Sequence, residues 1–228
     1  MRTVAETGST NADLLDAART GASEGLWLRA ERQTSGRGRV GRAWLSPVGN
    51  LYASTIVRLH PGEPEAATLA LVAAVALEEV ASAYAPGKLQ LKWPNDLMAG
   101  PAKLAGILLE RADDAVVIGF GVNLAYHPEN LERPTTSIAA LTAGAPDPAV
   151  FLADLAEAFA RWLARWRGEG LAAVRARWLQ RAHPIGSALT SSAAEGLFEG
   201  LDKDGALLLR RADGRITIVR AGDVFLSP

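Results

Sequence analysis

The chain has 228 residues, no cysteine and a formal net charge of -1. The absence of cysteine excludes disulfides, thiolate metal ligands and a cysteine nucleophile, and the near-zero net charge argues against broad electrostatic binding to nucleic acid. Hydrophobic residues make up 49% of the chain and charged residues 21%, which is typical of a soluble globular protein with a sizeable core.

The first 85 residues predict two helices and two strands. The N-terminus lacks the apolar region of a signal peptide, which favours a cytoplasmic location. The long apolar segment carries Glu78 and Glu79, so a buried core helix is expected there rather than a membrane span. The expected elements are a helix that follows Ser9-Thr10-Asn11 and ends near Arg19, strands over residues 25–31 and 50–58, and a helix over residues 65–84.

The next hundred residues predict three strands followed by two helices. Strands that succeed one another along the chain imply an antiparallel meander, so the fold class is α+β rather than alternating βαβ. The last two strands are expected to join at Asp113-Asp114. The expected elements are strands over residues 89–93, 103–111 and 115–122, and helices over residues 148–166 and 171–181.

The pattern changes at His183-Pro184-Ile185-Gly186. Short apolar runs follow, separated by turn signals at residues 202–205 and 212–214. They predict a small barrel of three or four strands, which is near the lower size limit for independent stability and is expected to pack on the main domain. The predicted domains are residues 1–183 and 184–228.

Residues 36–42, Gly-Arg-Gly-Arg-Val-Gly-Arg, alternate glycine with arginine. The glycines permit close approach of the backbone to a ligand, and the arginines match carboxylate or phosphate oxygens. The same residues fit the dinucleotide pattern G-x-G-x-x-G, but Trp44-Leu45-Ser46-Pro47 follows instead of a helix, which argues against that alternative. An anion-binding loop and a solvated basic surface loop both remain open on this evidence.

Two polar segments exceed what packing requires. Ser9-Thr10-Asn11 is a helix N-cap signal, yet three polar residues are more than one cap needs, and together they could bind a neutral heterocycle. In the second segment, a turn over residues 98–101 would place Asp96 opposite Lys103, with Cβ atoms ~5 Å apart. That pair is either a surface salt bridge or part of a ligand or metal site.

Two further features have structural and functional interpretations. Gly119-Phe120-Gly121-Val122-Asn123 is a strand whose glycines would admit a ligand close to the backbone. Asn123 could pair with an adenine edge or simply end the strand in a turn. Trp44 could cover a base or pack in the core.

Together these segments resemble the biotin–protein ligases. The match is in order and spacing and extends over nearly the whole chain. It implies a sheet-and-helix catalytic domain like those of class II aminoacyl-tRNA synthetases, with an SH3-like barrel at the C-terminus. The motifs are Ser9-Thr10-Asn11, Gln33 with residues 36–42, Lys92-Trp93-Pro94-Asn95-Asp96, Lys103-Leu104-Ala105-Gly106-Ile107 and Gly119-Phe120-Gly121-Val122-Asn123.

The resemblance implies that biotin and ATP form biotinyl-5′-AMP, with Mg²⁺ accompanying ATP, and that a lysine of a carboxylase's biotin carboxyl carrier protein then takes the biotinyl group. It implies catalytic roles for Lys103, Arg37, Arg39 and Asp96. It places Ser9, Thr10, Asn11 and Gln33 at the biotin ureido group, and Arg37, Gly38, Arg39 and Lys103 along the rest of biotin. It assigns ATP contacts to Arg37, Arg39, Arg42, Trp44 and Asn123.

Two rival functions are a lipoate or octanoate ligase, whose loop would read Arg-Arg-x-Ser-Gly-Gly, and a non-catalytic ligand-sensing module. Some members of the resembled family carry an N-terminal DNA-binding domain. Because the Ser-Thr-Asn motif begins at residue 9, no such domain and no operator binding are expected. No membrane partner is expected, and a homodimer is one alternative for the oligomeric state.

Overall fold

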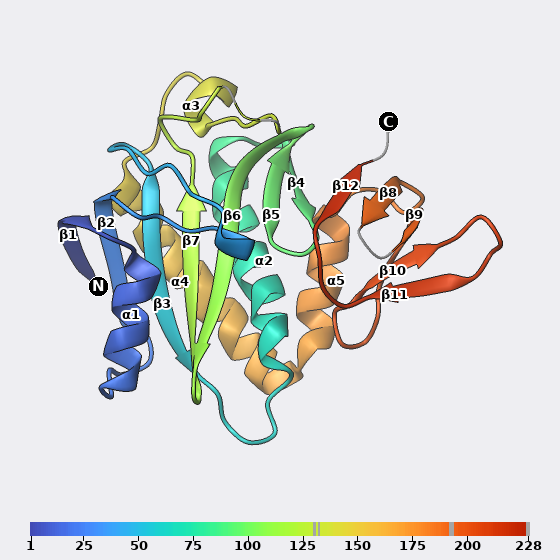
Figure 1. Ribbon diagram of the computed structural model, residues 1–228, viewed down its shortest axis with the longest axis horizontal. Helices are drawn as coiled ribbons and strands as arrows, with labels where there is room; N and C mark the ends of the chain where they lie inside the picture. Colours follow the sequence, from blue (N-terminus) through green and yellow to red (C-terminus); the bar gives the residue numbers. More distant parts are fainter. Residues whose placement is uncertain (130, 132, 192–193, 227–228) are drawn as a thin grey trace.

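A seven-stranded sheet with the order β1-β2-β3-β7-β6-β5-β4 forms the centre of the computed structural model (Figure 1). The structure describes residues 1–129, 131, 133–191 and 194–226. Strands β1 and β2 are parallel and all other neighbours are antiparallel, which confirms the predicted α+β class. The strands are β1 (Arg2–Thr7), β2 (Trp27–Gln33), β3 (Leu51–Arg58), β4 (Leu89–Lys92), β5 (Asp96–Ala99), β6 (Ala102–Ala112) and β7 (Ala115–Val122).

Helices cover the two faces of this sheet unequally (Figure 1). Helices α2, α4 and α5 pack on one face, and α1 packs on the other, where the glycine–arginine loop also crosses. The predicted helices are all present. Their bounds are α1 (Thr10–Arg19), α2 (Leu69–Tyr84), α4 (Pro148–Glu169) and α5 (Leu171–Arg181), with a short α3 (Ile138–Leu141) and the 3-10 turns η1 (Arg39–Gly41) and η2 (Ala66–Thr68).

The sequence of β7 shows which side chains pack on each face of the main sheet. Successive side chains of a strand point to opposite sides. Its even-numbered residues from Val116 to Val122 join the large core under α2 and α4, whereas Ala115 and Val117 join the smaller core under α1. Gly119 and Gly121 are the next residues of β7 that face the α1 side. They have no side chains, and the cavity begins at this part of the strand.

Helix α2 forms the centre of the large core. Eleven of its residues are buried, including Glu78, whose carboxylate binds Arg177 and Arg181 of α5 at 2.9 and 3.1 Å. The segment Ala66–Tyr84 has the length and apolar composition of a membrane span, but 67% of it is buried inside the protein. The predicted core helix is confirmed.

Local structure departs from the sequence-based expectation in three places. Strand β1 was not predicted, because its side chains are mostly exposed and show no apolar alternation; it forms through backbone pairing with β2. The β5–β6 turn is shorter than expected, since Ala99 pairs with Ala102. Ser9 precedes α1 but its side chain makes no capping bond.

Strands β8 to β12, within residues 188–191 and 194–226, form a separate five-stranded antiparallel sheet with the order β11-β10-β9-β8-β12. The prediction of three or four strands was therefore too low. The buried side chains of this sheet belong to the same continuous core as α2 and α5, as expected for a small domain that packs on the main one. The strands are β8 (Ala188–Ser191), β9 (Glu195–Leu201), β10 (Leu207–Arg210), β11 (Ile216–Val219) and β12 (Val224–Leu226).

Candidate active site

A cavity of about 610 Å³ lies on the α1 face of the main sheet. Its walls come from α1, the glycine–arginine loop, β4 to β7, the segment 128–135 and the start of β12. All twelve site residues expected from the sequence line it: Ser9, Thr10, Asn11, Gln33, Arg37, Gly38, Arg39, Arg42, Trp44, Asp96, Lys103 and Asn123.

The first part of the cavity floor is formed by Gly119 of β7 and Leu108 of β6, next to Ser54 of β3, which does not line the cavity. The register pairs Ser54 with Gly119 and Gly119 with Leu108. Asn11 lies above the glycine, because a Cβ at Gly119 would be 2.2 Å from Asn11 Oδ1. The space directly over Gly119 therefore holds a protein side chain, although Gly119 still lines the cavity, and the approach of a ligand to this strand stays a prediction.

Hydrogen bonds join the residues at this end into one network. Gln33 Oε1 accepts from the backbone N–H of Thr10 at 2.9 Å, and Gln33 Nε2 donates to Ser46 Oγ at 3.1 Å. Thr10 Oγ1 and Ser54 Oγ are 2.7 Å apart. Ser9, Thr10 and Asn11 are all at least 95% buried. This end of the cavity is polar but carries no net positive charge from these residues.

Trp44 covers the second row of the floor. The register pairs Gly121 with Gly106 and Gly106 with Asp96. A Cβ at Gly121 would lie 2.6 Å from the Trp44 ring, so this glycine too accommodates a protein side chain. The indole Nε1 is buried without a hydrogen-bond partner among the described residues, which leaves one donor available in the cavity. Asn123 lies nearby and donates from Nδ2 to Thr136 O at 3.0 Å.

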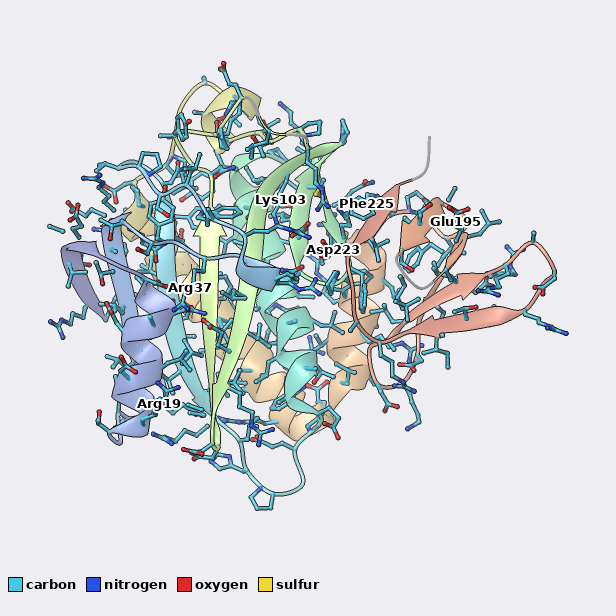
Figure 2. The ribbon with its side chains drawn as sticks, viewed as in Figure 1. Arg19, Arg37, Lys103, Glu195, Asp223 and Phe225 are labelled. Atoms are coloured by element: carbon cyan, nitrogen blue, oxygen red, sulfur yellow. The ribbon has the colours of Figure 1, made fainter. Side chains whose placement is uncertain are left out.

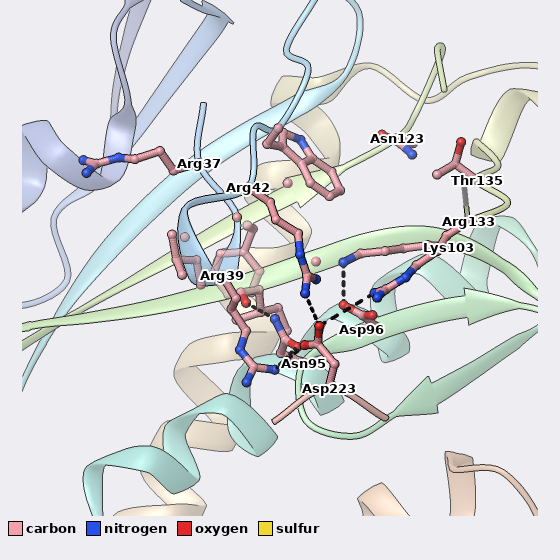
Figure 3. A pocket seen from close by; sticks show the side chains of 18 of the residues that line it. Arg37, Arg39, Arg42, Asn95, Asp96, Lys103, Asn123, Arg133, Thr135 and Asp223 are labelled. Atoms are coloured by element: carbon pink, nitrogen blue, oxygen red, sulfur yellow. Dashed lines mark hydrogen bonds and ion pairs between the residues drawn. The ribbon is translucent and has the colours of Figure 1, made fainter. Parts of the chain in front are cut away.

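Lys103 and Asp96 form the charged centre of the cavity (Figure 3). Lys103 Nζ is 2.6 Å from Asp96 Oδ1 and lies 5.4 Å from the centroid of the Trp44 ring. The expected ion pair exists, but not by direct opposition, because Lys103 pairs with Met98 and the register shifts between Leu97 and Met98. The bulge places both side chains on the same face.

Lys92 is a second cation beside Asp96, at 3.7 Å. Burial lowers the pKa of Lys92, and the charge of Asp96 opposes that effect. The Lys92 ammonium also lies 5.6 Å from the ring centroid of Phe225 in β12. The Lys92-Trp93-Pro94-Asn95-Asp96 motif therefore supplies one carboxylate and one amine to the same part of the cavity.

Asp223, just before β12, joins the glycine–arginine loop to the C-terminal sheet. Its carboxylate forms ion pairs with Arg42, with Arg39 at 3.6 Å and with Arg133 at 3.8 Å (Figure 3). Partial burial raises the pKa of Asp223, but the three guanidinium groups outweigh burial, so its pKa lies below the usual value. Three cations thus gather around one carboxylate.

The loop itself is a short hairpin with η1 at its tip. Trp44 N donates to Gly36 O at 2.9 Å and Gly38 N donates to Arg42 O at 2.7 Å. The chain turns back after Gly41 instead of opening a helix, so the dinucleotide-binding alternative is wrong. Arg39 donates to Asn95 Oδ1 at 3.1 Å, whereas Arg37 is exposed and points away from Arg39 and Arg42 (Figures 2 and 3).

Lys92, Asn95, Arg133 and Asp223 are among the charged or polar cavity residues that had no role assigned from the sequence. Lys92 and Asn95 lie inside a motif that was recognised, so their position was available as a signal. Arg133 and Asp223 have no local signal, because only the tertiary structure brings residues so far apart in the chain to one place.

The arrangement favours a ligand with a neutral polar end and an anionic end. The network around Thr10 and Gln33 offers donors and acceptors, and the opposite end offers two lysines and three arginines against two carboxylates. Within the described part of the chain, none of the three histidines lines the cavity. Its chemistry is suited to charge neutralisation rather than to a histidine-activated nucleophile.

Comparisons with known proteins agree with this geometry. The chain matches the biotin/lipoate A/B protein ligase family over residues 7–123 and the biotin protein ligase C-terminal domain over residues 189–227. The chain belongs to the biotin/lipoate A/B protein ligase family. The resemblance predicted from the motifs is confirmed.

Individual relatives match over nearly all of this chain and most of their own length. A biotin–[acetyl-CoA-carboxylase] ligase of Paracoccus denitrificans is 42% identical over 98% of this chain and 99% of its own. The enzyme of the same name from Mycobacterium tuberculosis is 38% identical over 97% of this chain and 86% of its own. The biotin protein ligase of Aquifex aeolicus, solved with biotin and ATP, superimposes with a TM-score of 0.89 at 26% identity, covering 99% of this chain and 98% of that one.

Proposed function

We propose that this chain is an ATP-dependent biotin–protein ligase. The reaction joins the carboxylate of biotin to the α-phosphate of ATP, which gives biotinyl-5′-AMP and releases pyrophosphate. A lysine amine of a biotin carboxyl carrier protein or domain then attacks the acyl carbon, and AMP leaves. The observation that carries the proposal is one cavity that joins the neutral network at Thr10 to the cationic group at Lys103.

The first step brings a carboxylate against a triphosphate, so two anions must be held together. Positioning and charge neutralisation supply most of the catalysis in such a reaction. Lys103 lies between Asp96 and Trp44, and we assign it to the biotin carboxylate and the developing charge on the α-phosphate. Arg39 and Arg42 already gather around a carboxylate, and we assign them to the phosphates.

The remaining assignments follow the two ends of the cavity. Ser9, Thr10 and Gln33 would bind the ureido group of biotin, and Trp44 would cover the adenine. Because Asn123 Nδ2 donates to Thr136, its free oxygen is the group available to an adenine amino group. Arg37 faces away in this conformation, so its contact with biotin or phosphate stays a prediction, as does a cytoplasmic location.

The donor set suits a Mg²⁺ ion that arrives with ATP. No group of three or more His, Cys, Asp or Glu residues within the described ranges could hold a metal. Mg²⁺ bound to nucleotides uses phosphate oxygens and one or two carboxylates. Asp96, whose side chain is 13% exposed at the cavity, is the carboxylate that we propose for it, and the ion would neutralise charge on the phosphates.

Exchange of radioactive pyrophosphate into ATP tests the first step. We expect exchange that depends on biotin and does not occur with lipoate in its place. Exchange that depends on lipoate would identify the rival ligase, and the absence of exchange with either acid would identify a non-catalytic binding protein. The second step is measured as a mass increase of a carboxylase carrier domain, with a carrier variant lacking the acceptor lysine as the control.

A further inference from the structure

The hairpin of β10 and β11 projects from the C-terminal sheet, away from the main domain (Figure 1). Strand β11 ends the sheet order, so it pairs with β10 on one side and with no other described strand on its second side. The backbone groups of such an edge can bond to another polypeptide, and many proteins protect them with lysine, proline or a bulge. Residues Ile216–Val219 of β11 contain none of these three.

One face of this hairpin is apolar and exposed to solvent. Side chains alternate between the two faces of a strand, and Val219 is buried in the core whereas Ile216 and Ile218 are 47% and 48% exposed. Leu208 of β10 pairs with Ile218, so it lies on the same face, where it is half-buried. Contiguous exposed apolar side chains with polar residues around them mark sites of protein contact.

Positive charge surrounds the apolar face. Residues 207–220 contain four arginines and a single acidic residue, Asp213, in a chain whose formal net charge is -1. Two of the arginines have acidic neighbours, whereas Arg211 and Arg220 are exposed and form no ion pair within the described part of the chain. The apolar face and the four arginines together form the hairpin patch, whose complement is a surface with acidic groups around an apolar centre.

The hairpin patch lies close to the cavity along the chain. Asp223, which lines the cavity, follows Val219 by four residues, so their Cα atoms are at most about 15 Å apart. Gly222 O accepts from Arg39 at 3.2 Å, which ties this connection to the glycine–arginine loop. A folded domain of about 100 residues has a radius of gyration of about 13 Å. One such domain can therefore contact the cavity and the hairpin patch at the same time.

We propose that the hairpin patch is a docking surface for the carrier domain that supplies the acceptor lysine. This inference rests on the proposed function, because the transfer step is the one that brings a second protein to the cavity. The carrier places an apolar surface with acidic residues around it on Ile216 and Ile218, while its lysine enters the cavity. Docking there adds affinity for the folded carrier and leaves the activation of biotin unchanged.

A second copy of this chain fits the hairpin patch less well than an acidic partner does. Antiparallel pairing of two β11 strands would bring the arginines of one copy close to those of the other, and like charges opposite each other in a sheet are destabilising. The same arginines attract an acidic domain and raise its rate of association at low ionic strength. The KM for the carrier is therefore expected to increase with salt.

Measurement of the two half-reactions with Ile218→Glu tests the proposal. The new carboxylate disrupts the apolar centre and repels acidic groups, so we expect the KM for the folded carrier domain to rise about tenfold. Biotin-dependent pyrophosphate exchange should change by no more than about twofold. Release of the biotinyl group from the adenylate to hydroxylamine, which needs no docking, should keep the wild-type rate. Val150→Glu, at a side chain of α4 that is 54% exposed, is the matched control.

Arg211→Glu tests the contribution of charge. It should also raise the KM for the carrier, and the rise should be larger at low than at high ionic strength. An unchanged KM for the carrier in folded Ile218→Glu would overturn the proposal, as would a loss of exchange as large as the loss of transfer.

Two further outcomes complete the test. A wild-type dimer that Ile218→Glu dissociates while the KM for the carrier stays unchanged would assign the hairpin patch to a second copy and overturn the proposal. If Ile218→Glu does not fold, Arg211→Glu decides by the same criterion. Wild-type protein without biotin-dependent exchange would instead reject the proposed function, whereas normal exchange with an unchanged KM for the carrier would reject the docking surface alone.

Discussion

Lys103 shows how one side chain is held ready at the centre of the cavity. Its ammonium is 2.6 Å from Asp96 and 5.4 Å from the Trp44 ring centroid, and its backbone N–H donates to Pro134 O, outside β6, at 2.9 Å. A charge fixed in this way does not need to reorganise as the reaction proceeds, which is how preorganised electrostatic groups lower a barrier.

Replacement of Lys103 by alanine should reduce biotin-dependent exchange by about 10²–10³-fold, because the cation at the reacting phosphate is lost. The fold should remain intact, since Asp96 keeps Lys92 at 3.7 Å as a partner. Exchange rates and a thermal unfolding curve measure the two effects. Lys203→Ala, which removes a lysine that is 86% exposed, is the control, and near-normal exchange in Lys103→Ala would refute the assignment.

At the scale of elements, the junction between α5 and β8 places a histidine in the interior. His183 is 7% exposed, and its Nε2 has no hydrogen-bond partner among the residues described. It lies beside Trp93, Trp178 and Phe198. Burial lowers the pKa of His183 below its usual value of 6.5, and the charge of Lys92 contributes to the same effect.

This shift predicts a dependence of stability on pH. The unfolded chain takes up a proton at His183 near pH 6.5, whereas the folded chain does so only at lower pH. The contribution of His183 is therefore most favourable above about pH 6.5 and is lost as the pH falls toward the folded pKa, with a slope of at most about 1.4 kcal/mol per pH unit.

Urea unfolding at about pH 7.5 and 5.5 measures this effect. The loss of unfolding free energy on acidification should be smaller in His183→Gln than in the wild type. His60→Gln, at an exposed side chain that pairs with Glu63 at 3.1 Å, should not reduce the wild-type difference, because a protonated His60 is stabilised by that carboxylate. An equal loss in wild type and His183→Gln would show that other groups cause the acid sensitivity.

At the scale of the whole molecule, the C-terminal sheet and the main domain share one core. Phe198 of β9 is 2% exposed and meets Trp178 of α5 edge to face, with ring centroids 6.4 Å apart. Trp93 Nε1 donates to Gly205 O at 3.1 Å, and Asp223 binds Arg39 and Arg42 across the same boundary. The site and the core therefore both depend on the docking of this sheet.

A shared core predicts that the two parts unfold together. Phe198→Ala should lower the free energy of unfolding by about 3–5 kcal/mol. All six tryptophans lie within residues 1–183, and two of them, Trp93 and Trp178, contact the C-terminal sheet, so tryptophan fluorescence reports the main domain together with the docking of that sheet. Its transition should shift in Phe198→Ala as far as the transition seen by circular dichroism. Ile216→Ala, at a side chain that is 47% exposed, is the control, and an unshifted fluorescence transition would argue for independent domains.

The sequence by itself determined the elements and motifs whose signals are local. Apolar periodicity predicted α2, β6 and β7. Contiguous motifs predicted which residues line the cavity, because residues that are neighbours on one strand or loop remain close in space once that strand or loop forms. The predicted start of a helix at residue 148 is likewise confirmed, since α4 begins at Pro148 and Asp147 accepts from Ala149 N at 2.6 Å.

Only the tertiary structure decided which distant residues meet. Strand β1 has no side-chain pattern and exists through backbone pairing, and the bulge that brings Asp96 to Lys103 depends on the register of β5 and β6. Asp223 and Arg133 reach the glycine–arginine loop from other parts of the chain. Such contacts follow from register and domain packing, which are long-range properties, whereas periodicity and motif spacing record only local conformation and burial.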